Sequence, residues 1–179
     1  MIEGENEFMT DVLFYQNYTY VADISAIVLC IICWLLLHSS YTVREKSLII
    51  FKAGTVCLMM ATVCSISFHT AITRITESRK ILIYVLQDGI YLLLILTFVL
   101  LCNYFGTLLK LEERPARLLG AVSWGGYAVF AFLEIGSPFT HLGFYIDADL
   151  MVHQNFYFDP FRFAYIYYCI VLVLSLIHI

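Results

Sequence analysis

The stretch that decides the fold runs from Ile81 to Tyr104 and reads ILIYVLQDGIYLLLILTFVLLCNY. Gln87 and Asp88 interrupt an otherwise long apolar run. Since an α-helix rises about 1.5 Å per residue, about 20 apolar residues cross the ~30 Å hydrocarbon core of a bilayer, and the stretch is predicted to span a membrane. An ionised Asp in such a helix costs about 2.5–3.5 kcal/mol, so Asp88 requires a partner, a water-filled recess or a proton.

Asp88 shares one face of this predicted helix with two tyrosines. Tyr84, Asp88 and Tyr91 follow one another at spacings of four and three residues, as neighbours on a helix surface do. We expect this face, with Gln87 next to Asp88, to be directed into the protein rather than into lipid. Two interpretations of Asp88 remain open at this point. It forms a hydrogen bond to a neighbouring helix, or it faces a ligand or signal, the default role of an intramembrane carboxylate.

The composition of the whole chain is that of an integral membrane protein. Hydrophobic residues make up 61% of the 179 residues and charged residues 13%, whereas soluble domains have about 45–50% and about 25%. No basic patch is present to bind nucleic acid. All six cysteines lie in apolar runs, and we expect the Cys30-x-x-Cys33 pair to be buried apolar residues rather than a redox or zinc half-site.

The apolar runs predict an all-α fold, a polytopic transmembrane bundle of about five helices. The predicted spans are about 21–38, 48–71, 81–104, 118–136 and 163–179. Residues 1–20 form an acidic N-terminal tail, and residues 137–162 form the longest later connection. We expect Gly136-Ser137-Pro138 to end the fourth helix.

The basic residues predict that the N-terminus lies outside the cytoplasm, because cytoplasmic loops carry an excess of Lys and Arg. With that orientation the inner connections hold six basic residues and the outer segments four: Arg44, Lys46, Lys52, Lys110, Arg114 and Arg117 against Arg74, Arg79, Lys80 and Arg162. The bias is modest, and the N-terminal tail, which has no Lys or Arg, supports it. The 1–20 tail and the 137–162 loop are then extracytoplasmic.

This orientation places Asp23, His69, Asp88 and Glu134, from four different helices, in the outer half of the bundle. One hypothesis is an outward-open polar recess that they line, roofed by residues 139–160. The alternative is that Asp23, His69 and Glu134 are interfacial residues, each within about a turn of a span end. We favour the alternative for those three residues, whereas Asp88 is too deep for it.

Small residues mark one surface of the fourth predicted helix. Ala121, Gly125 and Ala128 follow one another at spacings of four and three, which lets another helix approach closely, in this chain or in a homodimer. No phosphate loop, nucleophile elbow or zinc motif occurs, and the histidines are scattered singly. The sequence therefore predicts no catalytic site, metal or cofactor.

The segment Glu134-Ile135-Gly136-Ser137-Pro138-Phe139-Thr140, followed by Gly143-Phe144-Tyr145-Ile146-Asp147, resembles the multi-span sensor regions that precede GGDEF diguanylate cyclase domains in bacteria. Asp159-Pro160 and Tyr165-Ile166-Tyr167-Tyr168 are similar to the continuation of that pattern. The resemblance implies an input module in the bacterial plasma membrane whose output domain makes or breaks cyclic di-GMP. No GGDEF or EAL signature is present, so no catalytic residue is transferred.

The leading functional hypothesis is therefore a membrane-embedded sensor for an extracytoplasmic signal, with the lipid bilayer as its surroundings. Its candidate sensing residues are Asp88, Gln87, Tyr84, Tyr91, His69, Glu134 and Asp23. The ending Ser175-Leu176-Ile177-His178-Ile179 looks like translated adapter sequence, which predicts a chain truncated before its output domain. The alternative is a small transporter or permease subunit, although no paired repeat supports it.

Overall fold

The computed structural model describes residues 20–36, 38, 46–73, 75–109, 112–141, 143–147, 150, 152–154 and 159–177. Its helices are Tyr20–Leu36, α2 (Lys46–Ile72), α3 (Lys80–Leu108, preceded by the 3-10 turn η1, Glu77–Arg79), α4 (Glu113–Thr140) and α5 (Pro160–Ile177). The all-α fold with five helices is thus confirmed for the described residues. Three of the helices, namely α2, Glu77–Leu108 and α4, are long and apolar enough to cross a membrane, while Tyr20–Leu36 and Pro160–Leu174 are shorter apolar helices.

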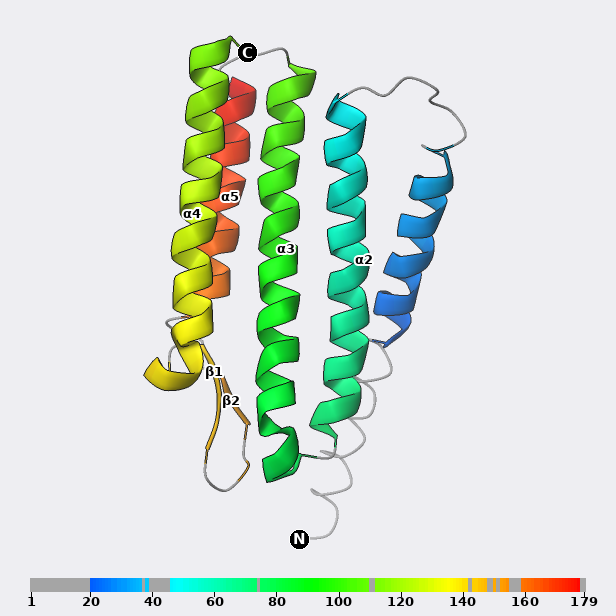
Figure 1. Ribbon diagram of the computed structural model, residues 1–179, viewed down its shortest axis with the longest axis vertical. Helices are drawn as coiled ribbons and strands as arrows, with labels where there is room; N and C mark the ends of the chain where they lie inside the picture. Colours follow the sequence, from blue (N-terminus) through cyan, green and yellow to red (C-terminus); the bar gives the residue numbers. More distant parts are fainter. Residues whose placement is uncertain are drawn as a thin grey trace, which may run out of the picture.

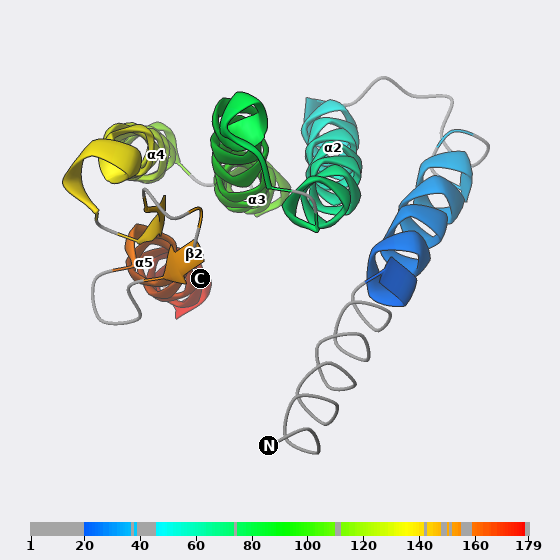
Figure 2. The same cartoon turned by 90° about the horizontal axis from the view of Figure 1, so that it is seen from below.

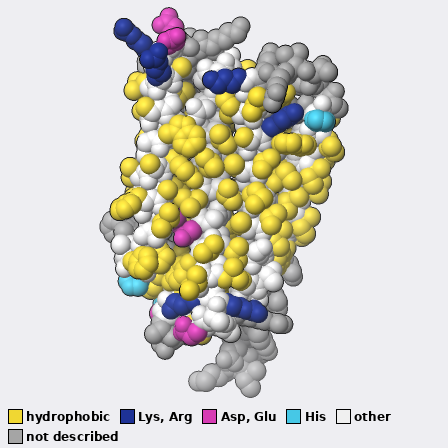
Figure 3. Space-filling model, in the orientation of Figure 1, with side chains coloured by type: hydrophobic (Ala, Val, Ile, Leu, Met, Phe, Trp, Pro, Cys, Tyr) yellow, Lys and Arg dark blue, Asp and Glu magenta, His cyan; other side chains and the backbone are white. Residues whose placement is uncertain are grey.

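The long helices form a layer, because α4, α3 and α2 stand side by side in one row (Figures 1 and 2). The shorter α5 packs against α3 and α4 on one side of this row, and the Tyr20–Leu36 helix stands next to α2 (Figure 2). In Figure 3 a broad hydrophobic belt covers the visible face, and the Lys and Arg side chains lie near its two ends. This distribution is the one expected of a multi-pass membrane protein.

The main hydrophobic core lies where α3, α4 and α5 meet. Ile95 and Val99 of α3, Phe130 of α4, and Tyr168 of α5 are all at most 3% exposed. The Tyr168 hydroxyl donates a 2.6 Å hydrogen bond to the carbonyl oxygen of Ser123 in α4. A hydroxyl buried among apolar side chains needs such a partner, so this bond fixes the position of α5 along α4.

The predicted end of α4 at Gly136-Ser137-Pro138 is wrong, because the helix continues through Pro138 to Thr140. A proline within a helix removes only the hydrogen bond to the residue four positions earlier, and its ring crowds that carbonyl, which belongs to Glu134. The helix bends and goes on, and Figure 1 shows its last turn swinging outward. His141, with a left-handed backbone (φ 54°), follows the helix end.

The predicted loop 137–162 contains a β-hairpin that the sequence analysis did not anticipate. Strands β1 (Phe144–Ile146) and β2 (Val152–Gln154) pair antiparallel. The Tyr84 hydroxyl of α3 accepts a 2.7 Å hydrogen bond from the Ile146 N–H, and Lys80 Nζ donates to the Asp147 carbonyl at 3.0 Å. Ser137 Oγ of α4 donates to the Phe144 carbonyl at 3.4 Å. The hairpin is therefore fastened to both α3 and α4 at this end of the bundle (Figure 1).

Candidate functional site

A group of polar side chains lies between α3, α4 and the start of α5, inside an otherwise apolar bundle. We call it the polar cluster, and its members are Gln87, Asp88 and Tyr91 of α3, Glu134 of α4, Asp159, and Arg162 of α5. The Glu134 carboxyl interacts electrostatically with the carboxyls of Asp88 and Asp159. Four of the residues predicted from the sequence therefore lie together, and Asp159 and Arg162 join them.

Glu134 is the most enclosed member of the polar cluster. Its side chain is 2% exposed, and its Oε2 atom has no hydrogen-bond partner within the described part of the chain. The favoured interpretation of Glu134 as an interfacial residue stays a prediction. Because α4 continues six residues beyond it to Thr140, Glu134 lies within the helix and is buried against the bundle. A buried carboxylate oxygen without a partner is costly, and such groups in membrane helices are typically functional.

Asp159 begins α5 and was not among the candidate residues. Its Oδ1 accepts the Phe161 N–H at 3.0 Å, and Pro160 occupies the first position of the helix. Asp before Pro is a typical helix start, since the carboxylate accepts a free N–H and proline has none to leave unpaired. The side chain is 3% exposed, and its Oδ2 lies 3.8 Å from Arg162 Nε. The Asp-Pro pair before an apolar run was the signal that could have identified it.

Tyr91 connects the polar cluster to the aromatic core. Its ring stacks on Phe161 with centroids 4.4 Å apart and planes at 16°. Its hydroxyl lies within hydrogen-bonding reach of Gln87, and it also interacts electrostatically with Glu134, Asp159 and Arg162. Tyr91 is thus coupled electrostatically to both helices that face α3, and its ring contact among the described residues is with Phe161.

Asp88 is half-buried, and none of the hydrogen bonds among the described residues involves it. Figure 3 shows an acidic side chain within the hydrophobic belt of the visible face. The cluster contains three carboxyls and one guanidinium, so it is rich in negative charge when all its members are ionised. It is an environment that can accept a positive charge or a proton.

The structure places the other predicted residues elsewhere. Ser65 Oγ of α2 donates a 2.7 Å hydrogen bond to Asp23 Oδ2, and His69 Nδ1 donates to the Ser65 carbonyl at 2.7 Å. No contact among the described residues joins Asp23 or His69 to the polar cluster, so they form a separate group between α2 and the Tyr20–Leu36 helix. The Tyr84 hydroxyl binds the hairpin through the Ile146 N–H, and its sensing role stays a prediction.

The predicted packing surface is exposed within this chain. Ala121, Gly125 and Ala128 are all exposed, and a Cβ atom at Gly125 would have no neighbour within 4 Å. The close contact with α5 is made by Gly126, where a Cβ would lie 2.5 Å from Tyr167 Cε1. The contact therefore lies on an adjacent face of α4, and packing of the Ala121 surface against a second copy stays a prediction.

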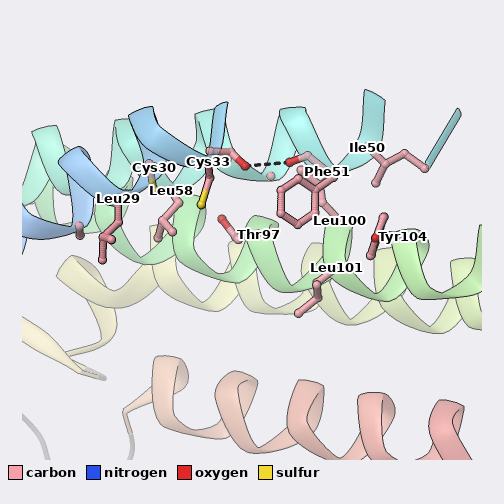
Figure 4. Close-up of a pocket in the computed structure, with 13 residues that line it drawn as sticks. Leu29, Cys30, Cys33, Ile50, Phe51, Leu58, Thr97, Leu100, Leu101 and Tyr104 are labelled. Carbon is pink, nitrogen blue, oxygen red and sulfur yellow. Dashed lines mark hydrogen bonds between the residues drawn. The ribbon is translucent and has the colours of Figure 1, made fainter. Parts of the chain in front are cut away.

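A second feature is an apolar groove of about 370 Å³ between the Tyr20–Leu36 helix, α2 and α3 (Figure 4). Cys30 and Cys33 line it from the first helix, and both have free thiols. Within the described ranges, no three His, Cys, Asp or Glu residues are grouped in a way that could hold a metal ion.

Comparison of the chain with protein-family models, with curated proteins and with solved structures found no match.

Proposed function

We propose that this chain is the membrane-embedded input module of a bacterial signalling protein and that the polar cluster receives an extracytoplasmic signal. The observation that carries the proposal is the buried Glu134 carboxyl, whose Oε2 has no hydrogen-bond partner among the described residues, while the carboxyls of Asp88 and Asp159 influence it electrostatically. A change in the charge of a buried carboxyl without a hydrogen-bond partner has a large effect on its interaction energy with the neighbouring carboxyls. A ligand or proton that neutralises it removes like-charge repulsion between three helices at once.

The route of the signal follows from how the cluster is held. It joins α3, α4 and α5, and it lies at the end of the bundle where the hairpin is fastened by Tyr84 and Ser137. Pro138 loosens α4 one turn beyond Glu134. A change in the cluster would therefore shift α4 against α5, and long helices carry such shifts to the opposite end of a bundle.

The sequence resemblance supports the identity of the output. The segment that resembles GGDEF-associated sensor regions, residues 134–147, supplies Glu134, the proline bend and strand β1. Glu134 is a member of the polar cluster, and β1 belongs to the hairpin that is fastened at the same end of the bundle. The proposed topology has the N-terminus outside the bacterial plasma membrane, and the proposed output is a cytoplasmic domain that makes or breaks cyclic di-GMP.

The experiment places the chain ahead of a diguanylate cyclase domain in a bacterium and measures cyclic di-GMP with a fluorescent reporter. Glu134→Gln should shift the basal output severalfold, because it removes the charge and keeps the shape. Glu113→Gln is the matched control, since Glu113 lies exposed at the other end of the same helix and pairs with the exposed Arg117. If both variants insert into the membrane and give the wild-type output, the proposal fails.

A transporter subunit is the second candidate, and two observations favour it. Asp88 is half-buried, and none of the hydrogen bonds among the described residues involves it; α4 also contains Pro138 beside the cluster. The test is proton uptake into proteoliposomes that contain a pH-sensitive dye. Uptake that Asp88→Asn abolishes would favour transport over sensing.

A further inference from the structure

The apolar groove between the Tyr20–Leu36 helix, α2 and α3 extends over the depth of one leaflet. Its α2 residues run from Ile50 to Leu58, and α2 begins at Lys46. Its α3 residues run from Thr97 to Tyr104, and α3 ends at Leu108. At about 1.5 Å per residue, the groove reaches from about 6 Å to about 18 Å below this end of the helices. Half of the ~30 Å hydrocarbon core is about 15 Å, so the groove matches one layer of acyl chains.

The wall of the groove offers only apolar surface to an occupant. Thr55 Oγ donates to the Phe51 carbonyl at 3.1 Å, as the dashed line in Figure 4 shows, and Thr97 Oγ donates to the Leu93 carbonyl at 2.9 Å. The two hydroxyls are thus bonded within their own helices. Leu58, Leu100 and Leu101 also line the groove (Figure 4). A volume of about 370 Å³ lies within the range of small-molecule sites, and an unbranched hydrocarbon chain fits such a wall.

The groove opens sideways because the first helix does not follow α2 along its length. The Tyr20–Leu36 helix is fastened to α2 near its start, through Asp23 and Ser65 and through Tyr20 and Thr70. Toward Leu36 it leans away from α2 (Figure 1). The splayed part is the part that carries Cys30 and Cys33. The groove is therefore open along this splayed part of the first helix.

A positive charge stands where the headgroup of such a lipid would lie. Lys52 directly follows the groove residues Ile50 and Phe51, and its Nζ lies 5.7 Å from the centre of the Trp34 ring. Lys46 is exposed at the start of α2. A long lysine side chain within a turn or two of a helix end extends to the headgroup layer, where it attracts anionic phosphate.

We propose that this groove binds one acyl chain of an anionic phospholipid whose phosphate pairs with Lys52. The site is separate from the polar cluster and lies at the opposite end of α3, so it does not depend on the proposed signalling role. It would couple the position of the Tyr20–Leu36 helix to the lipid composition of one leaflet.

The test uses the full chain reconstituted into phosphatidylcholine nanodiscs that contain a small fraction of photoreactive phosphatidylglycerol or, in a parallel sample, photoreactive phosphatidylcholine. Crosslinked peptides are then located by mass spectrometry. We expect crosslinks to concentrate on groove residues of the first helix and α3, with phosphatidylglycerol preferred: Leu29, Cys30, Cys33, Thr97, Leu100 and Leu101. Lys52→Gln should reduce this preference about fivefold, the factor expected for one lysine near an anionic headgroup.

A matched pair of variants on one helix tests the groove itself. Cys33→Trp fills the groove, whereas Ile32→Trp adds the same side chain at a neighbouring exposed position that does not line it. Only Cys33→Trp should remove the groove crosslinks. The wild-type crosslinking map tests the proposal even if Cys33→Trp fails to fold.

Crosslinks spread evenly over outward-facing positions such as Val85 and Phe132 would overturn the proposal. Crosslinks from the groove to a second copy of the chain would also overturn it, because the groove would then be a protein interface. Equal crosslinking by the two lipids with and without Lys52 would refute the assigned headgroup.

Discussion

The two adjacent glycines of α4 give the sharpest test of the helix packing. Gly126→Ala adds a Cβ that would lie 2.5 Å from Tyr167 Cε1, 3.0 Å from Cζ and 3.1 Å from the hydroxyl. The Tyr167 ring must move, and its 2.9 Å hydrogen bond to the Val122 carbonyl is then lost. Gly125→Ala adds the same methyl group where nothing lies within 4 Å.

The expected magnitudes follow from these contacts. Overpacking costs about 1–3 kcal/mol, and the lost hydrogen bond costs about 0.5–1.5 kcal/mol. Replacing Gly by Ala in a helix returns up to about 1 kcal/mol. We therefore expect Gly126→Ala to lower the free energy of unfolding by about 0.5–3.5 kcal/mol, and Gly125→Ala to leave it unchanged or raise it slightly.

The assay is reversible unfolding in mixed detergent micelles, followed by circular dichroism. Tyr167→Ala on the Gly126→Ala background provides a double-mutant cycle, and the cost of the added methyl should largely disappear there because its neighbour is gone. Equal destabilisation by Gly125→Ala and Gly126→Ala would refute the described register of α4 against α5. The Ala121, Gly125 and Ala128 surface would then be the true packing face.

Three further predictions concern the polar cluster and the β-hairpin. Glu134→Leu should raise the free energy of unfolding by about 1–3 kcal/mol, because it removes a buried oxygen that has no partner among the described residues. The same variant should abolish the signalling output. A loss of stability in thermal unfolding would instead show that Glu134 has a partner. Tyr84→Phe should leave the Ile146 N–H without its acceptor and therefore speed its hydrogen exchange, measured by mass spectrometry. The α3 amides should stay protected. Unchanged exchange at Ile146 would contradict the described hydrogen bond between Tyr84 and the hairpin. Asp159→Ala should lower the free energy of unfolding by about 1 kcal/mol in thermal unfolding, because it removes the cap on the Phe161 N–H. Asp159→Asn keeps an acceptor oxygen and should lower it much less. Equal losses of stability would mean that the charge of Asp159 matters rather than its capping.

The helices could be predicted from the sequence because length and apolarity are local properties. The predicted spans 48–71 and 81–104 lie within α2 and α3, each within a few residues of the observed ends. The fourth prediction, 118–136, is short at both ends. Pro115 lies in the first turn of α4, where a missing N–H costs nothing, and Pro138 bends the helix without ending it.

The rotation of each helix about its axis could not be predicted in the same way. In a membrane both the lipid-facing and the protein-facing surfaces are apolar, so hydrophobicity does not identify the buried face. This is why the sequence pointed to Gly125, whereas Gly126 makes the contact. The spacing of Tyr84, Asp88 and Tyr91 did place them on one side of α3, but their partners depend on the tertiary fold. Tyr84 binds a hairpin that no local pattern in residues 137–162 predicted.

The polar cluster could not be predicted as a unit, because the residues in and around it each have a structural role when considered alone. Asp159 caps α5, Pro138 bends α4, and Tyr91 stacks on Phe161. Each of these interactions could form in a bundle without the Glu134 carboxyl, because none of them uses it. A leucine at position 134 would leave all of them in place. Helix packing therefore gives no reason for a 2% exposed carboxyl near two others. A role in which its charge changes would give one, and that is the physical basis of the proposal that this end of the bundle receives a signal.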